Sequence, residues 1–225
     1  MPLHVSRIRA ICFDVDGTLS DTDDVMVAQL AGLLHPIHFL FPGKDLIRVA
    51  RGIVMEVEAP ANFLVGLPDL IGLDAEIFAL KDWLVRWSKM KTKPFQLIPG
   101  TREMLENLSQ RYPLAIVSVR DTSPTMQFLH QFNLAAFFKC IATGQTCQHT
   151  KPFPDPILWA AGYMGFPPEA CLMVGDTSVD IRAGKAAGAQ TVGVLCGFGE
   201  EAELRKHGAD MILNRTDELV QVLEE

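Results

Sequence analysis

Short apolar runs alternate with amphipathic segments along most of the chain. Residues 8–13 (IRAICF) are apolar and lead into a polar stretch, which predicts a buried strand that ends in a turn. After Pro99-Gly100 the alternation becomes regular. The further strands expected are residues 114–119, 139–142, 171–174, 191–195 and 211–213, and the helices are 101–111, 123–132, 156–164, 179–187 and a closing helix.

Strands that alternate with helices of this length predict an α/β fold with a doubly wound parallel sheet. Residues 20–95 lack strand signals and are rich in Leu, Ala, Val and charged residues at helical spacing. We therefore expect an α/β core of residues 1–19 and 96–225, with residues 20–95 inserted as an α-helical cap domain. The length of 225 residues agrees with this division, since an ordinary domain has about 150.

Charge and cysteine content narrow the class of protein. The net charge is −7, which disfavours nucleic acid or an anionic membrane as the main partner. Residues 25–43 carry no formal charge, but Pro36 would interrupt a membrane-spanning helix. The 5 cysteines are widely spaced and form no CxxC, as expected for thiols in a reducing cytoplasm. We expect a cytoplasmic monomer or homodimer with no nucleic-acid or membrane partner.

Polar residues follow the predicted strands one after another. Asp14 and Asp16 come after the first strand, Ser118 closes the second, Lys151 lies after the third, and Asp176 follows the fourth. In a doubly wound sheet, ligands bind beyond the carboxyl ends of the strands. The sequence therefore predicts a functional site at this edge of the sheet.

Each of these residues can be interpreted either as part of a catalytic or binding site or as an ordinary structural residue. Asp14 and Asp16 can bind a hard cation, or one can attack phosphorus while the other handles protons, but DxDG is also a common turn. Ser118 can bind a phosphate oxygen or cap the next helix. Lys151 can neutralise a phosphoryl group or restrain a nucleophilic carboxylate, or it can be a solvated loop lysine.

The segment 175–180 (GDTSVD) also allows two interpretations. Asp176 can complete a metal site, and Asp180 can brace Lys151 or a metal-bound water. The same acidic residues can instead serve the N-terminus of a helix. Four such signals occur in order at successive strand ends, and this joint occurrence favours a functional site over ordinary structural roles.

Taken together, these motifs resemble the haloacid dehalogenase-like superfamily in its phosphatase branch. The resemblance rests on DVDGTL at 14–19, the strand-final Ser118, KPFPDP at 151–156 and GDTSVDIRAGKAAGA at 175–189. It covers roughly residues 1–19 and 96–225. The insert after the first motif looks like the helical cap of phosphoglycolate-phosphatase-like members.

The resemblance implies a role for each motif residue. Asp14 would be the nucleophile that forms an aspartyl-phosphate, and it would also bind Mg²⁺. Asp16 would be the general acid/base, and its main-chain oxygen would bind the metal. Ser118 and Lys151 would hold the phosphoryl group, and Asp176 would be a further metal ligand. Asp180 would support the site, and Thr18 can hydrogen-bond within the turn and is a weaker phosphate-binding candidate.

The second motif departs from the family pattern of Ser or Thr followed by Asn. Here it reads Ser118-Val119-Arg120, and Val119 offers no amide side chain. Arg120 can contact phosphate or substrate, or face solvent. This departure leaves the expected chemistry in place and leaves the substrate contacts open.

The expected function is Mg²⁺-dependent hydrolysis of a small phosphorylated metabolite, with a phosphoglycolate-like substrate favoured by the resemblance. Pyrophosphate, sugar phosphates and nucleotides stay open as substrates. Arg48 and Arg51 lie three residues apart in the expected cap and can bind a substrate carboxylate or second phosphate, or remain solvated.

Two alternative functions stay open. One is a phosphomutase of the β-phosphoglucomutase type, although the histidine that handles protons in that group would fall at Met26 here. The other is a non-catalytic phosphate-binding regulator on the same fold, which the altered second motif permits.

Overall fold

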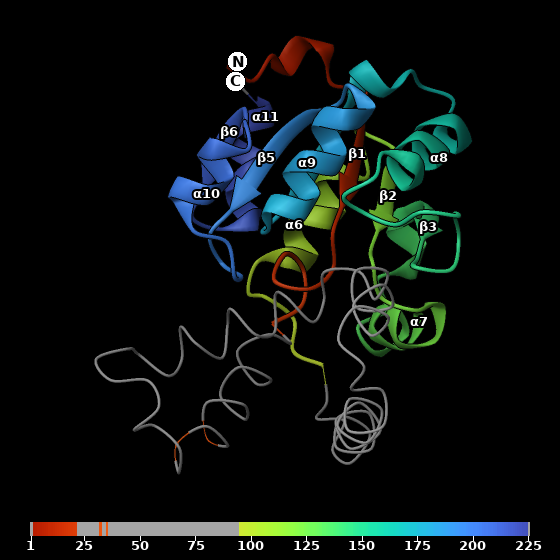
Figure 1. Cartoon of the computed structure of the whole chain (residues 1–225). Helices are drawn as coiled ribbons and strands as arrows, with labels where there is room; N and C mark the ends of the chain where they lie inside the picture. The colour runs from red at the N-terminus through yellow and green to blue at the C-terminus, as the bar shows by residue number, and fades with distance from the viewer. Residues whose placement is uncertain (1, 22–31, 33–34, 36–94, 225) are drawn as a thin grey trace, which may run out of the picture. The chain divides into compact units, whose positions relative to one another are not determined.

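The computed structural model describes residues 2–21, 32, 35 and 95–224 (Figure 1). The chain divides into two compact units, Met1–Val25 with Phe95–Glu225 and Met26–Pro94. The second unit lies almost wholly outside the described residues, so the helical cap of residues 20–95 stays a prediction. Arg48 and Arg51 lie outside the described residues as well.

A six-stranded parallel sheet forms the centre of the first unit. Its strand order is β3-β2-β1-β4-β5-β6, so β1 lies between the two halves of the sheet. This is the doubly wound α/β architecture expected from the sequence. The strands are β1 (Ala10–Phe13), β2 (Leu114–Val117), β3 (Phe138–Ala142), β4 (Cys171–Gly175), β5 (Gln190–Val194) and β6 (Met211–Leu213).

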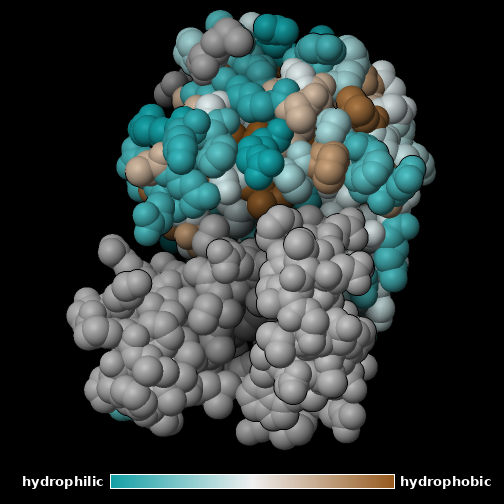
Figure 2. Space-filling model, viewed as in Figure 1, coloured by the Kyte–Doolittle hydropathy of each residue, from teal (hydrophilic) through white to brown (hydrophobic). Residues whose placement is uncertain are grey.

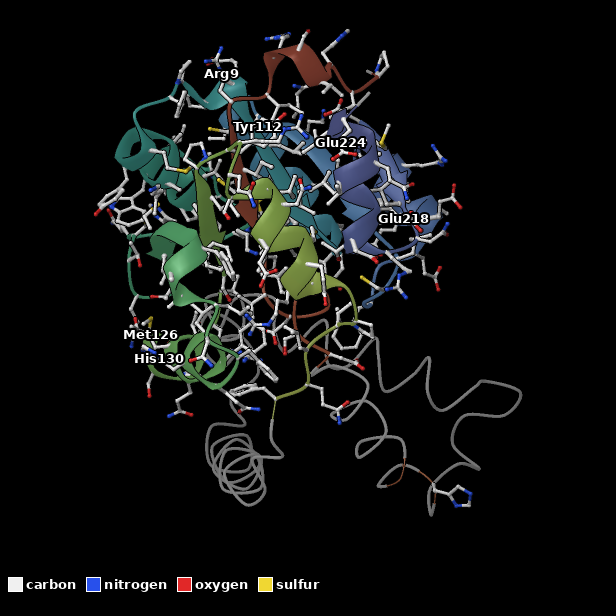
Figure 3. The ribbon with its side chains drawn as sticks, turned by 180° about the vertical axis from the view of Figure 1, so that it is seen from behind. Arg9, Tyr112, Met126, His130, Glu218 and Glu224 are labelled. Atoms are coloured by element: carbon white, nitrogen blue, oxygen red, sulfur yellow. The ribbon has the colours of Figure 1, made fainter. Side chains whose placement is uncertain are left out.

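Helices cover both faces of this sheet. Helices α8 and α9 lie on the face nearer the viewer in Figure 1, and α6 and α7 lie on the face seen in Figure 3, where Met126 and His130 mark α7. The α-helices are α6 (Thr101–Leu108), α7 (Thr122–Gln131), α8 (Asp155–Met164), α9 (Ser178–Ala187), α10 (Glu201–Lys206) and α11 (Leu219–Glu224). Short 3-10 helices occur at Val5–Arg7, Ala135–Phe137, Pro168–Ala170 and Thr216–Glu218.

The two faces of the sheet have different side chains, because successive residues of a strand point to opposite sides. In β1, Ile11 and Phe13 belong to a core of bulky residues that includes α6, α7 and α11. Ala10 and Cys12 belong to a second core of small residues against α8 and α9. All four β1 residues are fully buried, so this strand is enclosed on both faces.

The described helices differ from the sequence predictions chiefly at two points. Helix α6 begins at Thr101 as expected, with Gly100, whose φ is 83°, as its N-cap, but it ends at Leu108 rather than at residue 111. Helix α10 has no counterpart among the predicted elements, because it is six residues long and buries only Leu204.

The surface of the described core is largely hydrophilic in the view of Figure 2, with apolar residues scattered among polar ones. The large apolar side chains exposed in the described part of the chain are Phe153, Leu158, Trp159 and Tyr163. None of the helices described is both long and apolar enough to span a bilayer.

Candidate active site

The carboxyl ends of three strands and two adjoining segments bring the predicted site residues to one edge of the sheet. Asp14 follows β1, Ser118 follows β2 and Asp176 follows β4, while Lys151 lies in the loop before α8 and Asp180 in the first turn of α9. All five are buried, with at most 5% of each residue exposed. Such complete burial of charged groups requires that they be paired or bind an ion.

Lys151 joins two of these carboxylates. Its Nζ donates hydrogen bonds of 2.6 Å to Oδ1 of Asp14 and 2.6 Å to Oδ1 of Asp180. The second oxygen of Asp180, Oδ2, accepts hydrogen bonds from the Thr177 N–H at 3.0 Å and the Thr177 hydroxyl at 2.7 Å. The two interpretations that the sequence allowed for Asp180, a brace for Lys151 and a helix-capping residue, therefore occur together.

The pKa values of this cluster follow from burial and from shared charge. Burial raises the pKa of Asp14 to about 7, with a downward contribution from Lys151 and upward contributions from Asp180 and Asp16. Burial and the charges of Asp180 and Asp14 hold the pKa of Asp176 well above its usual range. Burial alone would lower the pKa of Lys151, but the carboxylates of Asp14 and Asp180 outweigh it and raise that pKa.

A glycine-containing loop after β5 fixes one side of Asp176. The Phe198 N–H donates a hydrogen bond of 2.7 Å to Asp176 Oδ2. A Cβ on Gly197 would lie 2.2 Å from that same oxygen, and a Cβ on Gly199 would lie 1.7 Å from the Asp176 main-chain oxygen. The loop therefore needs glycine at both positions in order to approach Asp176 this closely.

Three buried carboxylates lie close enough together to hold a metal ion. Oxygen atoms of Asp14, Asp176 and Asp180 lie within 4.8 Å of one another. Asp176 Oδ1 is buried and has no hydrogen-bond partner among the residues that the structure describes. A hard divalent cation such as Mg²⁺ binds carboxylate oxygens, so this donor set fits one. We expected Asp14 and Asp176 in this place from the sequence, with Asp180 in a supporting role.

Asp16 contacts a partner that the sequence did not reveal. Its Oδ1 accepts a hydrogen bond from Nη2 of Arg120, and the two side chains form an ion pair that is less than one-fifth exposed. The Arg120 guanidinium also lies over the Phe95 ring, with Cζ 5.1 Å from the ring centroid. No local signal could reveal this pair, since 104 residues separate its members in the chain.

Ser118 and Thr18 occupy fixed positions beside these groups. The Ser118 hydroxyl oxygen accepts a hydrogen bond of 3.1 Å from the Arg120 N–H. Thr18 is fully buried in the turn after β1, and its main-chain oxygen accepts a hydrogen bond of 2.7 Å from the Thr216 hydroxyl. Gly17 in this turn has φ of 72°, a conformation that favours glycine. The phosphate-binding roles of Ser118, Lys151, Thr18 and Arg120 stay predictions.

Known proteins resemble this chain over nearly its full length. It is 31% identical over 220 residues to a phosphoglycolate phosphatase of Aquifex aeolicus, covering 96% of this chain and 97% of the relative. It is 27% identical over 224 residues to the pyrophosphatase PpaX of Bacillus pumilus, covering 98% and 99%. A haloacid dehalogenase-like family hydrolase from Streptococcus pneumoniae superposes with a TM-score of 0.71 at 26% identity, covering 96% of this chain and 99% of the other.

A family model gives the same assignment. The model of the haloacid dehalogenase-like hydrolases matches residues 11–194, which contain every motif on which the resemblance rested. The predicted enzyme class, a phosphoric monoester hydrolase, is confirmed by this family and by the phosphatases among its relatives. The strand order, the buried acidic edge of the sheet and these matches agree, and the chain belongs to the haloacid dehalogenase-like hydrolases.

Proposed function

We propose that the protein is a Mg²⁺-dependent phosphatase that hydrolyses a small phosphomonoester through an aspartyl-phosphate on Asp14. One observation supports this most strongly: Asp14 is buried, hydrogen-bonded to Lys151, and grouped with Asp176 and Asp180. In this position the charge of Asp14 is partly offset by Lys151, and the carboxylates of Asp176 and Asp180 lie close by. That is the arrangement that a nucleophile needs when it attacks a phosphate, which is itself an anion.

In the proposed reaction, Asp14 attacks phosphorus while Lys151 offsets the negative charge of the incoming phosphoryl group. Asp16 donates a proton to the leaving oxygen and afterwards takes one from the water that hydrolyses the aspartyl-phosphate. Asp180, held by Thr177, keeps Lys151 directed at Asp14. Ser118, at the end of β2, binds a phosphate oxygen.

Asp14, Asp176 and the main-chain oxygen of Asp16 would hold the Mg²⁺ ion, and Asp180 lies close enough to join them through its carboxylate. When bound, the ion supplies positive charge that stabilises the transferring phosphoryl group.

For the substrate, we propose a small, strongly anionic phosphate ester, with 2-phosphoglycolate first and pyrophosphate second. Support comes from the relatives that match almost the whole chain, one named phosphoglycolate phosphatase and one pyrophosphatase. In this proposal the cap of residues 20–95 selects among such substrates, with Arg48 and Arg51 as its anion-binding residues. The cytoplasmic location and the monomeric or homodimeric state also stay proposals.

A panel of phosphorylated metabolites tests the proposal. The panel includes 2-phosphoglycolate, pyrophosphate, a sugar phosphate, a nucleotide and p-nitrophenyl phosphate, each assayed with Mg²⁺ and with a chelator. We expect Mg²⁺-dependent release of phosphate, with kcat/KM highest for 2-phosphoglycolate. Absence of Mg²⁺-dependent turnover on every ester would favour the non-catalytic regulator, and phosphate transfer between sugar positions without release would favour the phosphomutase.

A further inference from the structure

Four contacts fix Arg120 at the edge of the site, two through its guanidinium and two through its backbone. Its guanidinium is paired with Asp16 and lies over the Phe95 ring. Its N–H donates to the Ser118 hydroxyl oxygen at 3.1 Å, and its carbonyl accepts a hydrogen bond of 2.9 Å from the Gly144 N–H. The backbone beside it is also confined, since a Cβ on Gly144 would lie 2.4 Å from the Val119 oxygen.

These contacts separate two roles for Arg120. A phosphate-binding arginine turns its guanidinium toward the place where the phosphoryl group is bound, beside Ser118 and Lys151. In this structure the guanidinium is instead engaged with the carboxylate of Asp16, and the backbone of Arg120 is fixed relative to Ser118. An arginine held this rigidly can fix the direction of a carboxylate, because its planar fork defines where the partner oxygen lies.

We propose that Arg120 is a positioning residue for Asp16, and that it keeps this carboxylate directed so that its oxygen meets the leaving group of a bound ester. The inference rests on the proposed function, in which Asp16 transfers the proton. The inference also explains why the second motif differs from the family pattern. Its third residue, Arg120, positions the acid/base group Asp16. In this scheme Arg120 itself contacts neither the phosphorus nor the leaving oxygen.

The role has a specific kinetic consequence. A proton from Asp16 matters most when the leaving group is a strongly basic alkoxide, and least when it is a stable phenolate. The ratio kcat/KM reports on the steps up to loss of the leaving group. A misdirected Asp16 therefore lowers kcat/KM for alkyl phosphates far more than for aryl phosphates, whereas loss of a phosphate-binding group lowers both alike.

The test compares Arg120→Gln with the wild type on 2-phosphoglycolate and on p-nitrophenyl phosphate, with inorganic phosphate as a competitive inhibitor. We expect kcat/KM for the alkyl ester to fall by about 10- to 100-fold, since a positioned general acid contributes on the order of 10²–10⁴-fold. The aryl ester should stay within about 3-fold of the wild type, and the inhibition constant of phosphate should not change. Arg120→Lys should recover part of the loss, because it retains the charge without the fork.

Two further variants make the result specific. Asp16→Asn should show the same dependence on the leaving group, and the double variant Asp16→Asn with Arg120→Gln should lose little more, since both changes act on one group. Arg205→Gln is the matched control, because Arg205 is an exposed arginine paired with Glu201 on α10. It should leave both substrates unaffected, and urea unfolding of each variant verifies that the fold is intact.

The outcomes separate this inference from the function on which it rests. An equal loss for both esters with weaker inhibition by phosphate would show that Arg120 binds phosphate, and the inference would be wrong. An unchanged kcat/KM for both esters would show that the Arg120–Asp16 pair has no part in the reaction, and the inference would again be wrong. If the wild type hydrolysed neither ester, the proposed function itself would fail and the inference with it.

Discussion

Two lysine–aspartate clusters stand at opposite edges of the same sheet, and they are built differently. At the amino-terminal edge, Lys185 pairs with Asp210, whose Oδ2 also accepts hydrogen bonds from the Thr191 N–H at 2.8 Å and the Thr191 hydroxyl at 3.2 Å. At the carboxyl-terminal edge, Lys151 is shared by Asp14 and Asp180, with Asp176 close by. The first cluster has one carboxylate per lysine, and the second has three.

The pKa directions show what this difference means. Burial acts to raise the pKa of Asp210, but the hydrogen bonds from Lys185 and Thr191 outweigh it, and the pKa is lowered. Burial raises the pKa values of Asp14 and Asp176, and one lysine does not compensate. The ionised form is thus stabilised at one edge and disfavoured at the other. The comparison indicates that Lys185–Asp210 serves the fold, whereas the other edge is arranged to receive positive charge.

The largest expected effect is a loss of activity on substitution of Asp14, in the cluster at the carboxyl-terminal edge. Asp14→Asn should lower kcat on 2-phosphoglycolate by at least about 10³-fold, because removal of a nucleophile leaves only the residual rate given by binding. The metal-free protein at pH 8 should not lose stability, since the change removes a buried charge that burial disfavours and leaves Lys151 paired with Asp180. Steady-state kinetics and urea unfolding measure the two quantities. Full activity in this variant would contradict the assignment of Asp14.

The second effect is a pH dependence of stability in the chelator-treated protein. Asp14 has a pKa of about 7 in the folded state, against an ordinary value of 3.8 for an aspartate in water, so the folded state binds more protons between these values. Its contribution is fully present below about pH 4 and is lost as the pH rises through 7. The free energy of unfolding should fall by at most about 4 kcal/mol over that range, which follows from 1.36 kcal/mol per pKa unit.

Urea unfolding between pH 4 and pH 9 measures this slope, and Mg²⁺ should flatten it, because the ion binds the ionised carboxylates. Asp14→Asn provides the control, since it removes this titrating group and should reduce the slope. The carboxyl of Asp210 has the opposite effect on the pH dependence of stability. Because its pKa is lowered in the folded state, its ionised form stabilises the fold, and this contribution is lost only as the pH falls through that lowered pKa. A metal-free protein that grew more stable from pH 5 to pH 8 would contradict the interpretation of the acidic edge.

The third prediction concerns the Lys185–Asp210 pair at the amino-terminal edge of the sheet. Asp210→Asn should lower the free energy of unfolding by about 1–3 kcal/mol, because it weakens a partly buried, hydrogen-bonded ion pair and leaves the Lys185 charge without this partner. The values of kcat and KM should stay near those of the wild type. Urea unfolding and steady-state kinetics together check this. A loss of activity without a loss of stability would overturn the division between the two edges.

The smallest expected effect tests how the loop after β5 prepares Asp176. Gly197→Ala places a methyl group against Asp176 Oδ2, so we expect the affinity for Mg²⁺ to fall about 10-fold, as is common when the surroundings of a metal ligand change. Isothermal titration calorimetry measures the affinity directly. Gly162→Ala on α8 is the matched control, since its Cβ would meet no atom within 4 Å. Equal affinity in both variants would show that the loop tolerates this crowding.

The strands and the residues that follow them could be predicted from sequence for a simple reason. The buried parallel strands are short apolar runs, and the fold brings their carboxyl ends to one edge, so the sequence alone could assign Asp14, Ser118 and Asp176 to that edge. The sequence also offered Asp180 two partners, Lys151 and its own helix N-terminus. The structure joins it to both.

Other parts of the site depend on contacts that no local pattern encodes. The donor to Asp176 is a main-chain N–H of Phe198, which any residue except proline supplies. The glycine-rich segment 193–199 is the local signal for this loop, but glycines alone do not indicate which side chain the loop approaches. Arg120 could be named as a candidate phosphate ligand, whereas its pairing with Asp16 depends on how β1 and β2 lie side by side.

The core of bulky residues and the core of small residues, on opposite faces of the sheet, should differ in the substitutions that they accept. On the face of bulky residues, Leu, Ile and Phe can exchange when neighbouring side chains repack. On the face of small residues there is little room, and a Cβ on Gly184 of α9 would lie 2.4 Å from Cγ2 of Thr191. Helix α9 begins beside Asp176 and carries Asp180, so a larger side chain there would displace these buried carboxylates as well as the helix. Among descendants of this gene, we expect the α8–α9 face to accept fewer replacements than the face opposite.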